Sequence, residues 1–313
     1  MLALRWLSAL ALIVALSLLF WRYAHPASIA IASHRRAAAA RYATHPSAVI
    51  ALLALLAMYV LAALAPWLAT HDPTALLPQS FVNHPPSREL LFGTDYVGRD
   101  VFSRVLYGTR LSLSIALLAT VLSVILGTAY GLIAGFVGGA LDTAMMRVVD
   151  AFLAIPRIVL LIAIGALWAP LGVTSLVLIL GLTAWFGTSR LVRAEVLSLR
   201  ERDMVAAARA LGARDLAIVR RHVLPNVLTP VIVSATLGVA GVIINEATLS
   251  FLGIGISDPA PSLGNIIRDG SPFIATAWWA ALFPGLALVI TAMAYNLAGD
   301  GLRDAMDPRQ VDR

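Results

Sequence analysis

The chain has 313 residues, of which 60% are hydrophobic and 13% charged, and its mean hydropathy is +0.86. This composition excludes an ordinary soluble domain and indicates a polytopic membrane protein. All 23 basic residues are arginine. Without lysine the chain can carry neither the phosphate-binding loop of an ATPase nor a retinal Schiff base. Cysteine is absent, which excludes disulfides and thiolate metal sites.

The first apolar segment, residues 6–21, has sixteen residues, fewer than the roughly 20 that a membrane helix needs. Three interpretations are open: an extra spanning helix, a signal-peptide core followed by the small residues Ser28 and Ala30, or upstream sequence without functional weight. Translocating the arginines that follow would violate the positive-inside rule. We therefore favour an extra helix with its N-terminus outside and a basic cytoplasmic linker up to residue 46, which carries Arg22, Arg35, Arg36 and Arg41.

The second unit, residues 47–110, joins a core span to an external loop. Residues 47–69 are uncharged and long enough to cross the bilayer. Prolines forbid a long helix in the early loop; they are Pro73, Pro78, Pro85 and Pro86. From Asp100 onward we expect a helix whose face of Val101, Val105 and Leu106 lies on the membrane surface.

Three charged residues of this loop, Asp95, Arg99 and Asp100, would suit a catalytic cluster. Groups of this kind more often form a structural ion-pair network, which is the arrangement we expect here.

A glycine repeat marks the next apolar stretch, residues 111–141, which is uncharged up to its end. Gly127, Gly131, Gly135 and Gly139 are spaced four residues apart, so they form a ridge that lets another helix pack closely in lipid. The partner helix lies either in this chain or in a second subunit.

Residues 141–157 are predicted as a short return loop, because they carry Asp142, Arg147, Asp150 and Arg157. The following uncharged stretch, residues 158–189, would be about 48 Å long as one helix, more than a core of about 30 Å requires. Pro170 and Gly172 are expected to divide it into two spans, with Arg157 snorkelling from the first.

Residues 190–225 form the only long polar segment between apolar spans, with eight arginines and four acids. Residues 204–211 are rich in helix formers and end at Gly212, a typical helix stop. Asp215 is expected to cap a second short helix that ends at Leu224 and Pro225. We call this helix-turn-helix, residues 204–223, the elbow, and its alanines would let another protein approach closely.

The last two core spans follow the elbow. Residues 223–245 carry a small face of Ser234, Gly238 and Gly241, and the span is followed by Glu246 in an apolar context. A membrane-embedded acid is a candidate for the transport pathway, while the alternative is an interfacial pair with Arg268. Residues 270–299 form the last span, with a kink expected at Pro284.

Arginine counts set the expected topology. Four before the first core span, two in the return loop, eight in residues 190–225 and three in the tail place 17 in the cytoplasm, against 6 outside. This bias predicts an all-α transmembrane bundle with six core spans and both ends inside, and it explains the basic charge without nucleic acid. The expected units are residues 1–46, 47–110, a core of 111–300 containing 190–225, and a cytoplasmic tail of 301–313.

The alanine pair Ala207 and Ala208, Gly212, and Leu224 with Pro225 have the spacing of the EAA loop of ABC-importer permeases. Over about residues 47–309 the chain resembles the dipeptide and oligopeptide permease family, C-type subunit. The family pattern opens with Glu where this chain has Ala206, and has an apolar residue at His222.

The resemblance implies a permease subunit, not an enzyme, that forms half of the pathway of an importer for di- and oligopeptides in the bacterial inner membrane. The implied partners are a second homologous permease, two ATPases that bind ATP and Mg²⁺, an extracytoplasmic binding protein and the lipid bilayer, with no cofactor on this chain itself. The residues expected to couple to the ATPase are Ala206, Ala207, Ala208, Arg209, Gly212, Asp215, Leu224 and Pro225.

Other functions remain open from sequence. Nickel or glutathione systems of the same family are excluded by no residue. A secondary transporter needs paired acids or broken helices near the midplane, and the spans offer only Glu246. An intramembrane metalloprotease is disfavoured, because no H-E-x-x-H motif occurs and the six histidines lie outside the core spans.

Overall fold

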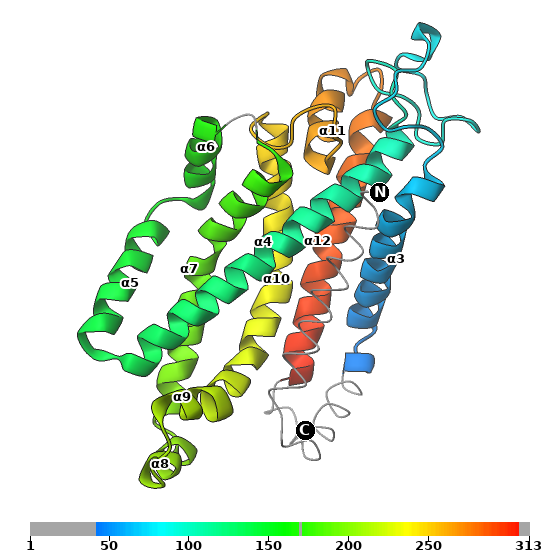
Figure 1. Cartoon of the computed structure of the whole chain (residues 1–313). Coiled ribbons are helices and arrows are strands. Elements are labelled where there is room, and N and C mark those ends of the chain that lie inside the picture. The colour runs from blue at the N-terminus through cyan, green and yellow to red at the C-terminus, as the bar shows by residue number, and fades with distance from the viewer. Residues whose placement is uncertain (1–41, 169–170, 307–313) are drawn as a thin grey trace.

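A computed structural model describes residues 42–168 and 171–306 (Figure 1). The predictions for residues 6–21, Pro170, Arg309 and Arg313 lie outside these residues. The helices are α3 (Pro46–Leu68), α4 (Val101–Val137), α5 (Gly139–Leu153), α6 (Arg157–Trp168), α7 (Val173–Arg200), α8 (Asp203–Ala210), α9 (Asp215–Ile218), α10 (Leu224–Phe251), α11 (Leu263–Gly270) and α12 (Trp279–Met306), with a π turn at Val219–Val223 and short 3-10 turns at Gln79–Phe81 and Ser271–Phe273.

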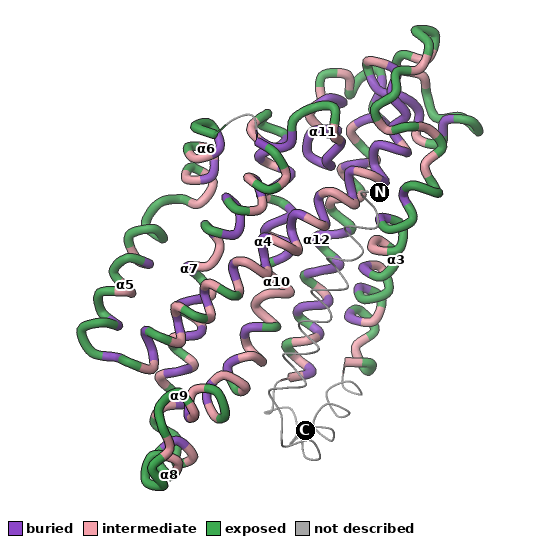
Figure 2. The backbone as a smooth tube through the Cα atoms, in the orientation of Figure 1, coloured by how far each residue is buried: buried purple, intermediate pink, exposed green. Residues whose placement is uncertain are grey.

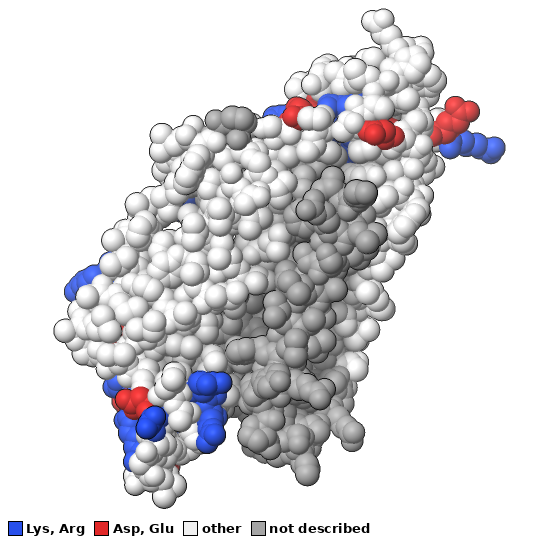
Figure 3. Space-filling model, in the orientation of Figure 1, with Lys and Arg blue, Asp and Glu red and all other residues white. Residues whose placement is uncertain are grey.

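Within the described residues, five helical segments are long and apolar enough to cross a membrane: α3, α4, α7, α12 and the continuous segment Asp215–Phe251. The pair α5 and α6, bent by 80°, makes a sixth if the two count as one broken span. The predicted all-α transmembrane bundle is confirmed. Charged side chains on the face shown in Figure 3 gather at the two ends, with largely uncharged surface between them.

Helix α4 is the longest element and runs obliquely from one end of the bundle to the other (Figure 1). Its 37 residues span about 55 Å. The helix continues unbroken across residue 110, where the sequence predicts a boundary between the units 47–110 and 111–300. The expectation that its first turns lie on the membrane surface is wrong, because Val101 and Val105 are buried against Leu263 of α11 and Trp279 of α12. These residues lie at the end of the bundle away from α8 and α9, which we call the α11 end (Figure 1).

The predicted return loop at 141–157 is also wrong, because most of it is the helix α5. Its charges are paired with α7: Arg193 donates to both oxygens of Asp142, at 2.5 and 2.7 Å, and Arg190 pairs with Asp150. Helix α6 has 12 residues, about 18 Å, too short to span a bilayer alone.

The interior of the bundle is apolar and lies where α3, α4, α7, α10 and α12 meet, as the buried segments of Figure 2 show. Outer faces expose large apolar side chains, among them Ile50 and Leu53 of α3, which suits a surface in contact with lipid. The start of α3 and the end of α12 lie together, since Gly301 packs against Ala48, and both lie toward the elbow end of the bundle in Figure 1.

Candidate functional site

The elbow projects from one end of the bundle, where α7 ends (Figure 1). Helix α8 ends as the sequence predicts: Gly212 follows it with φ of +76°, a left-handed conformation that favours glycine. The N–H of Gly212 donates to Arg209 O at 2.9 Å and that of Ala213 to Ala208 O at 3.0 Å. These two bonds form a Schellman motif, which fixes the direction of the chain as it leaves α8.

Two predictions about the second half of the elbow are wrong. Asp215 does not cap α9 through its side chain; the N-cap is Arg214, and Asp215 is the first helical residue. Leu224 and Pro225 do not end the helix, which continues into α10. The π turn explains this, because Leu224 N–H donates to Val219 O and the wider turn accommodates the proline ring that follows.

Two valines and one isoleucine of the elbow anchor it to the bundle. Val205, Ile218 and Val223 are fully buried in a cluster with residues of α7 and α10, including Val196 and Val227. A force on the elbow is therefore transmitted to these two helices, because close-packed side chains resist compression.

The outer surface of the elbow exposes small and apolar side chains among charged ones. Ala206 and Ala207 are exposed, Ala208 is half-buried, and Leu211 and Leu216 are 88% and 70% exposed. Neighbouring exposed leucines on a protruding turn suit contact with another protein. Neither leucine is among the coupling residues predicted from sequence, although their position on either side of Gly212 is a signal for their exposure.

Arginines hold the base of the elbow. Arg209 lies 5.7 Å from the ring centroid of Phe136 in α4, and its Nε is 4.0 Å from Asp215. Arg200, at the end of α7, lies with Nη1 3.5 Å from the carbonyl oxygens of Gly135 and Phe136. A cation at the C-terminus of α4 is favourable because the helix dipole is negative there.

The glycine ridge has a partner within this chain. A Cβ on Gly127, Gly131 or Gly135 would meet atoms of α7 at 2.9 Å or less, among them Ser189 O and the side chain of Val192. Gly139 is not part of this contact: it lies after the helix break with φ of +61°, and a Cβ there would meet nothing within 4 Å. The ridge therefore locks α4 to α7.

Asp95 and Arg99, two of the three residues predicted to form an ion-pair network, do so at the α11 end. Arg99 Nε is 2.7 Å from Asp95 and its Nη2 is 3.0 Å from Asp269; buried Arg104 pairs with the same two acids. Burial lowers the pKa of Arg99, but the charges of Asp95, Asp269 and Asp258 outweigh it and raise the pKa. The arginine therefore stays charged, as a structural tie needs.

Asp100 is a helix cap. Its carboxylate accepts from Ser103 N at 3.0 Å and from Thr70 Oγ1 at 2.9 Å, which fastens the end of α3 to the start of α4. No group of three or more potential metal ligands occurs among the residues that the structure describes.

Glu246 is fully buried and bonded to serines. Its carboxylate accepts from Ser112 Oγ at 2.7 Å and from Ser250 Oγ at 2.8 Å, so it ties α10 to α4. The alternative pairing with Arg268 is wrong, because that arginine bonds Asp258 and Asp269. A role of Glu246 in the pathway stays a prediction.

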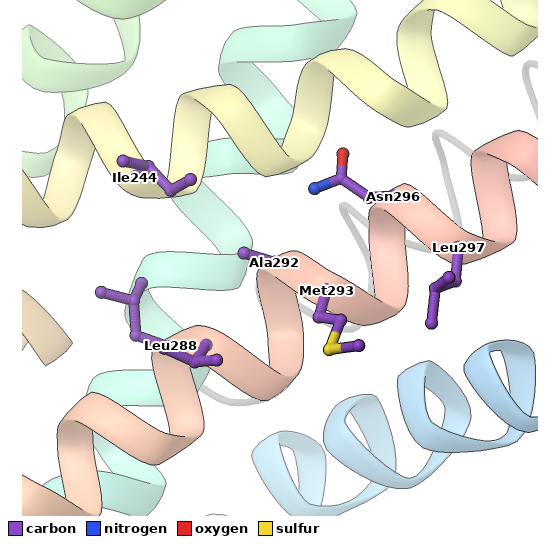
Figure 4. Close-up of a pocket in the computed structure, with 7 residues that line it drawn as sticks. Ile244, Leu288, Ala292, Met293, Asn296 and Leu297 are labelled. Atoms are coloured by element: carbon purple, nitrogen blue, oxygen red, sulfur yellow. The ribbon is translucent and has the colours of Figure 1, made fainter.

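An apolar groove of about 340 Å³ lies between α10 and α12 (Figure 4). Its lining is aliphatic apart from Met293 and the amide of Asn296. This lining has no acid, base or nucleophile, so the groove offers no catalytic chemistry.

These features define a multi-pass helical membrane protein with one helix-turn-helix that projects from the end of the bundle. Residues 127–312 match the model of the binding-protein-dependent transport system inner membrane component family. Residues 33–86 match the N-terminal transmembrane domain of oligopeptide transport permease C. The chain belongs to the binding-protein-dependent transport family, and is thus a permease subunit of the inner membrane and not an enzyme.

Curated relatives match most of the chain. A putative peptide transport system permease protein of Brucella abortus is 46% identical over 87% of this chain and 90% of its own length. The dipeptide transport system permease protein DppC of Bacillus subtilis is 38% identical over 84% and 82%. The di/tripeptide permease protein DppC of Pseudomonas aeruginosa is 39% identical over 86% and 90%. Transport systems of this family work with a binding protein and an ATPase.

Proposed function

We propose that the chain is the C-type permease subunit of an ATP-driven importer for di- and oligopeptides. The substrate class is supported by the peptide-transport names of relatives at 38–46% identity that cover more than four fifths of the chain. In this role the chain forms half of the translocation pathway, beside a second homologous permease, and receives peptide from an external binding protein.

The observation that carries the coupling role is the elbow, whose tip exposes Leu211 and Leu216 above a buried apolar base. Two ATPases that close on ATP move two such elbows together, and Val205 and Ile218 pass the motion to α7 and α10. Rocking of these helices switches access from the outer to the inner side. The coupling residues are those of residues 206–216, with Leu224 and Pro225 at the junction to α10.

The elbow end is assigned to the cytoplasm. Eight arginines lie in residues 190–225, and the start of α3 and the end of α12 lie toward the same end of the bundle. The positive-inside rule then places the C-terminus in the cytoplasm and the ion-pair network of the α11 end outside, where the binding protein docks.

Gly212→Val tests the coupling role. A Cβ at Gly212 meets nothing within 4 Å, so the substitution acts through backbone strain at φ of +76° alone. We expect the assembled transporter to insert normally and to lose peptide uptake and peptide-stimulated ATP hydrolysis. Gly285→Ala is the control, because Gly285 also faces open space but has an ordinary helical backbone. Normal uptake by the Gly212 variant would refute the coupling role.

Uptake of nickel or glutathione in place of peptides by the same assembled transporter would refute the substrate class and leave the coupling role intact. Uptake that persists after removal of the ATPases would favour a secondary transporter.

A further inference from the structure

A second cavity, of about 170 Å³, opens between α4, α7, α10 and the first residue of α6. Small and hydroxyl-bearing residues line it, among them Thr120, Ser123, Gly187, Ser234 and Gly238, together with one charged residue, Arg157. A Cβ on Gly187 or Gly238 would meet nothing within 4 Å, so both glycines face open space.

Arg157 was predicted to snorkel from the end of a span, and the structure places it in this cavity instead. One nitrogen, Nη2, donates to Leu180 O at 3.3 Å. Its Nε is buried and has no hydrogen-bond partner among the residues described. A guanidinium in an apolar bundle without a paired carboxylate is costly, which indicates a functional reason for its position.

A second residue that lines this cavity also has a buried polar atom without a hydrogen-bond partner within the described ranges. Thr120 Oγ1 has no hydrogen-bond partner in the described part of the chain. An arginine fork and a threonine hydroxyl that line one cavity, with no acid in its lining, fit an anion with more than one acceptor oxygen. Carboxylate and phosphate both match the planar fork of arginine, and of the two a peptide supplies the carboxylate.

We propose that this cavity binds the C-terminal carboxylate of a peptide in transit. Arg157 supplies paired N–H donors and Thr120 a hydroxyl, while Gly187 and Gly238 leave room for the last residue of the peptide. The cavity is smaller than the roughly 300–1,000 Å³ of pockets that enclose a whole small ligand, so it holds one end of the peptide. The proposal rests on the proposed function, in which peptides pass through this subunit.

The test compares transport of a dipeptide with that of its C-terminal amide by the full transporter in proteoliposomes, at concentrations that load the binding protein equally. In R157Q we expect transport of the free acid to fall about tenfold, because a hydrogen bond to a charged group is lost, and transport of the amide to change less than about twofold. R147Q is the control, because Arg147 is an exposed arginine of α5 outside the cavity.

No change in R157Q, or an equal loss for acid and amide, would overturn the proposal; an equal loss is also what a lipid phosphate held by Arg157 predicts. R157Q also removes the hydrogen bond to Leu180 O, so the near-isosteric T120V provides a second test. In T120V we expect the ratio of free-acid to amide transport to fall, but by less than in R157Q. A wild-type transporter that moves neither peptide would refute the proposed function instead, so the two failures are distinguishable.

Discussion

The ion pairs of Arg99 and Arg104 at the α11 end are buried, whereas the pair of Arg209 and Asp215 in the elbow is exposed and loose. Arg104 and Asp95 are 0% and 1% exposed in their side chains, while those of Arg209 and Asp215 are 47% and 74% exposed and 4.0 Å apart. The α11 end is therefore fixed by its ion pairs. The elbow is fixed by apolar packing beneath it, which leaves its outer surface free for a partner.

The largest effect is expected from Asp269→Asn. Asp269 accepts from both Arg99 and Arg104 at 3.0 Å, and its loss leaves buried arginine charge short of an acceptor. We expect the free energy of unfolding in detergent to fall by about 3–5 kcal/mol. Arg88→Gln serves as control, because Arg88 is an exposed arginine of the external loop before α4. A loss no larger than that of the control would show that the network does not stabilise this end.

Gly131→Ala tests the helix that connects the two ends. A Cβ at Gly131 would lie 2.5 Å from Ser189 O, a backbone atom that cannot move aside without shifting α7. We expect a loss of about 1–3 kcal/mol in the free energy of unfolding, measured by thermal denaturation. Gly285→Ala should be close to neutral, because its Cβ meets nothing within 4 Å. Equal stability of the two variants would contradict close packing of α4 on α7.

Leu211→Ser combined with Leu216→Ser should separate stability from contact at the elbow. Both side chains are exposed, so we expect unfolding to change by no more than about 0.5 kcal/mol. Copurification of the ATPase subunits should nevertheless be lost, because the apolar tip is removed. Leu76→Ser, in the loop at the opposite end and 68% exposed, should leave copurification unchanged. Retained ATPase in the double variant would show that the leucines are not part of the docking surface.

The core spans and the elbow could be predicted because their signals are local. Residues 47–69 are uncharged over a full membrane thickness, and the helix found is Pro46–Leu68. The end of α8 could also be predicted from a local signal, which is Gly212 after a run rich in alanine. The helix ends there because glycine readily adopts the left-handed conformation that a helix stop needs.

The features that could not be predicted from the sequence depend on contacts between residues that are far apart in the chain. Asp142 and Asp150 suggested a loop, but their partners Arg193 and Arg190 lie on α7, and pairing lets a charged segment fold as a helix. The position of Arg157 in the cavity that Thr120 also lines likewise depends on how α6 packs on α7 and α10. The exposure of Leu211 and Leu216 follows from the fold of the elbow, which composition does not show.

The smallest effect is expected at Asp72, an exposed carboxylate at the α11 end. Comparing Asp72 with the buried Asp269 tests whether burial or position makes a carboxylate stabilising. Asp72 accepts from Thr74 Oγ1 at 2.6 Å and from Thr74 N at 2.7 Å. The side-chain bond, and then the backbone bond, favour the charged carboxylate and lower the pKa of Asp72. The stabilisation is therefore complete above the pKa of the unfolded chain and is lost as the pH falls through the pKa of the folded protein.

Thr74→Val should raise the pKa of Asp72 toward its ordinary value, as measured by NMR titration of its carboxyl carbon, and should leave the unfolding temperature at neutral pH nearly unchanged. Thr74→Ser keeps the hydroxyl and should keep the lowered pKa. If both variants shift the pKa equally, the hydroxyl is not its cause. If the valine variant instead destabilises as much as Asp269→Asn, then position at the α11 end, and not burial, determines how strongly a carboxylate stabilises the fold.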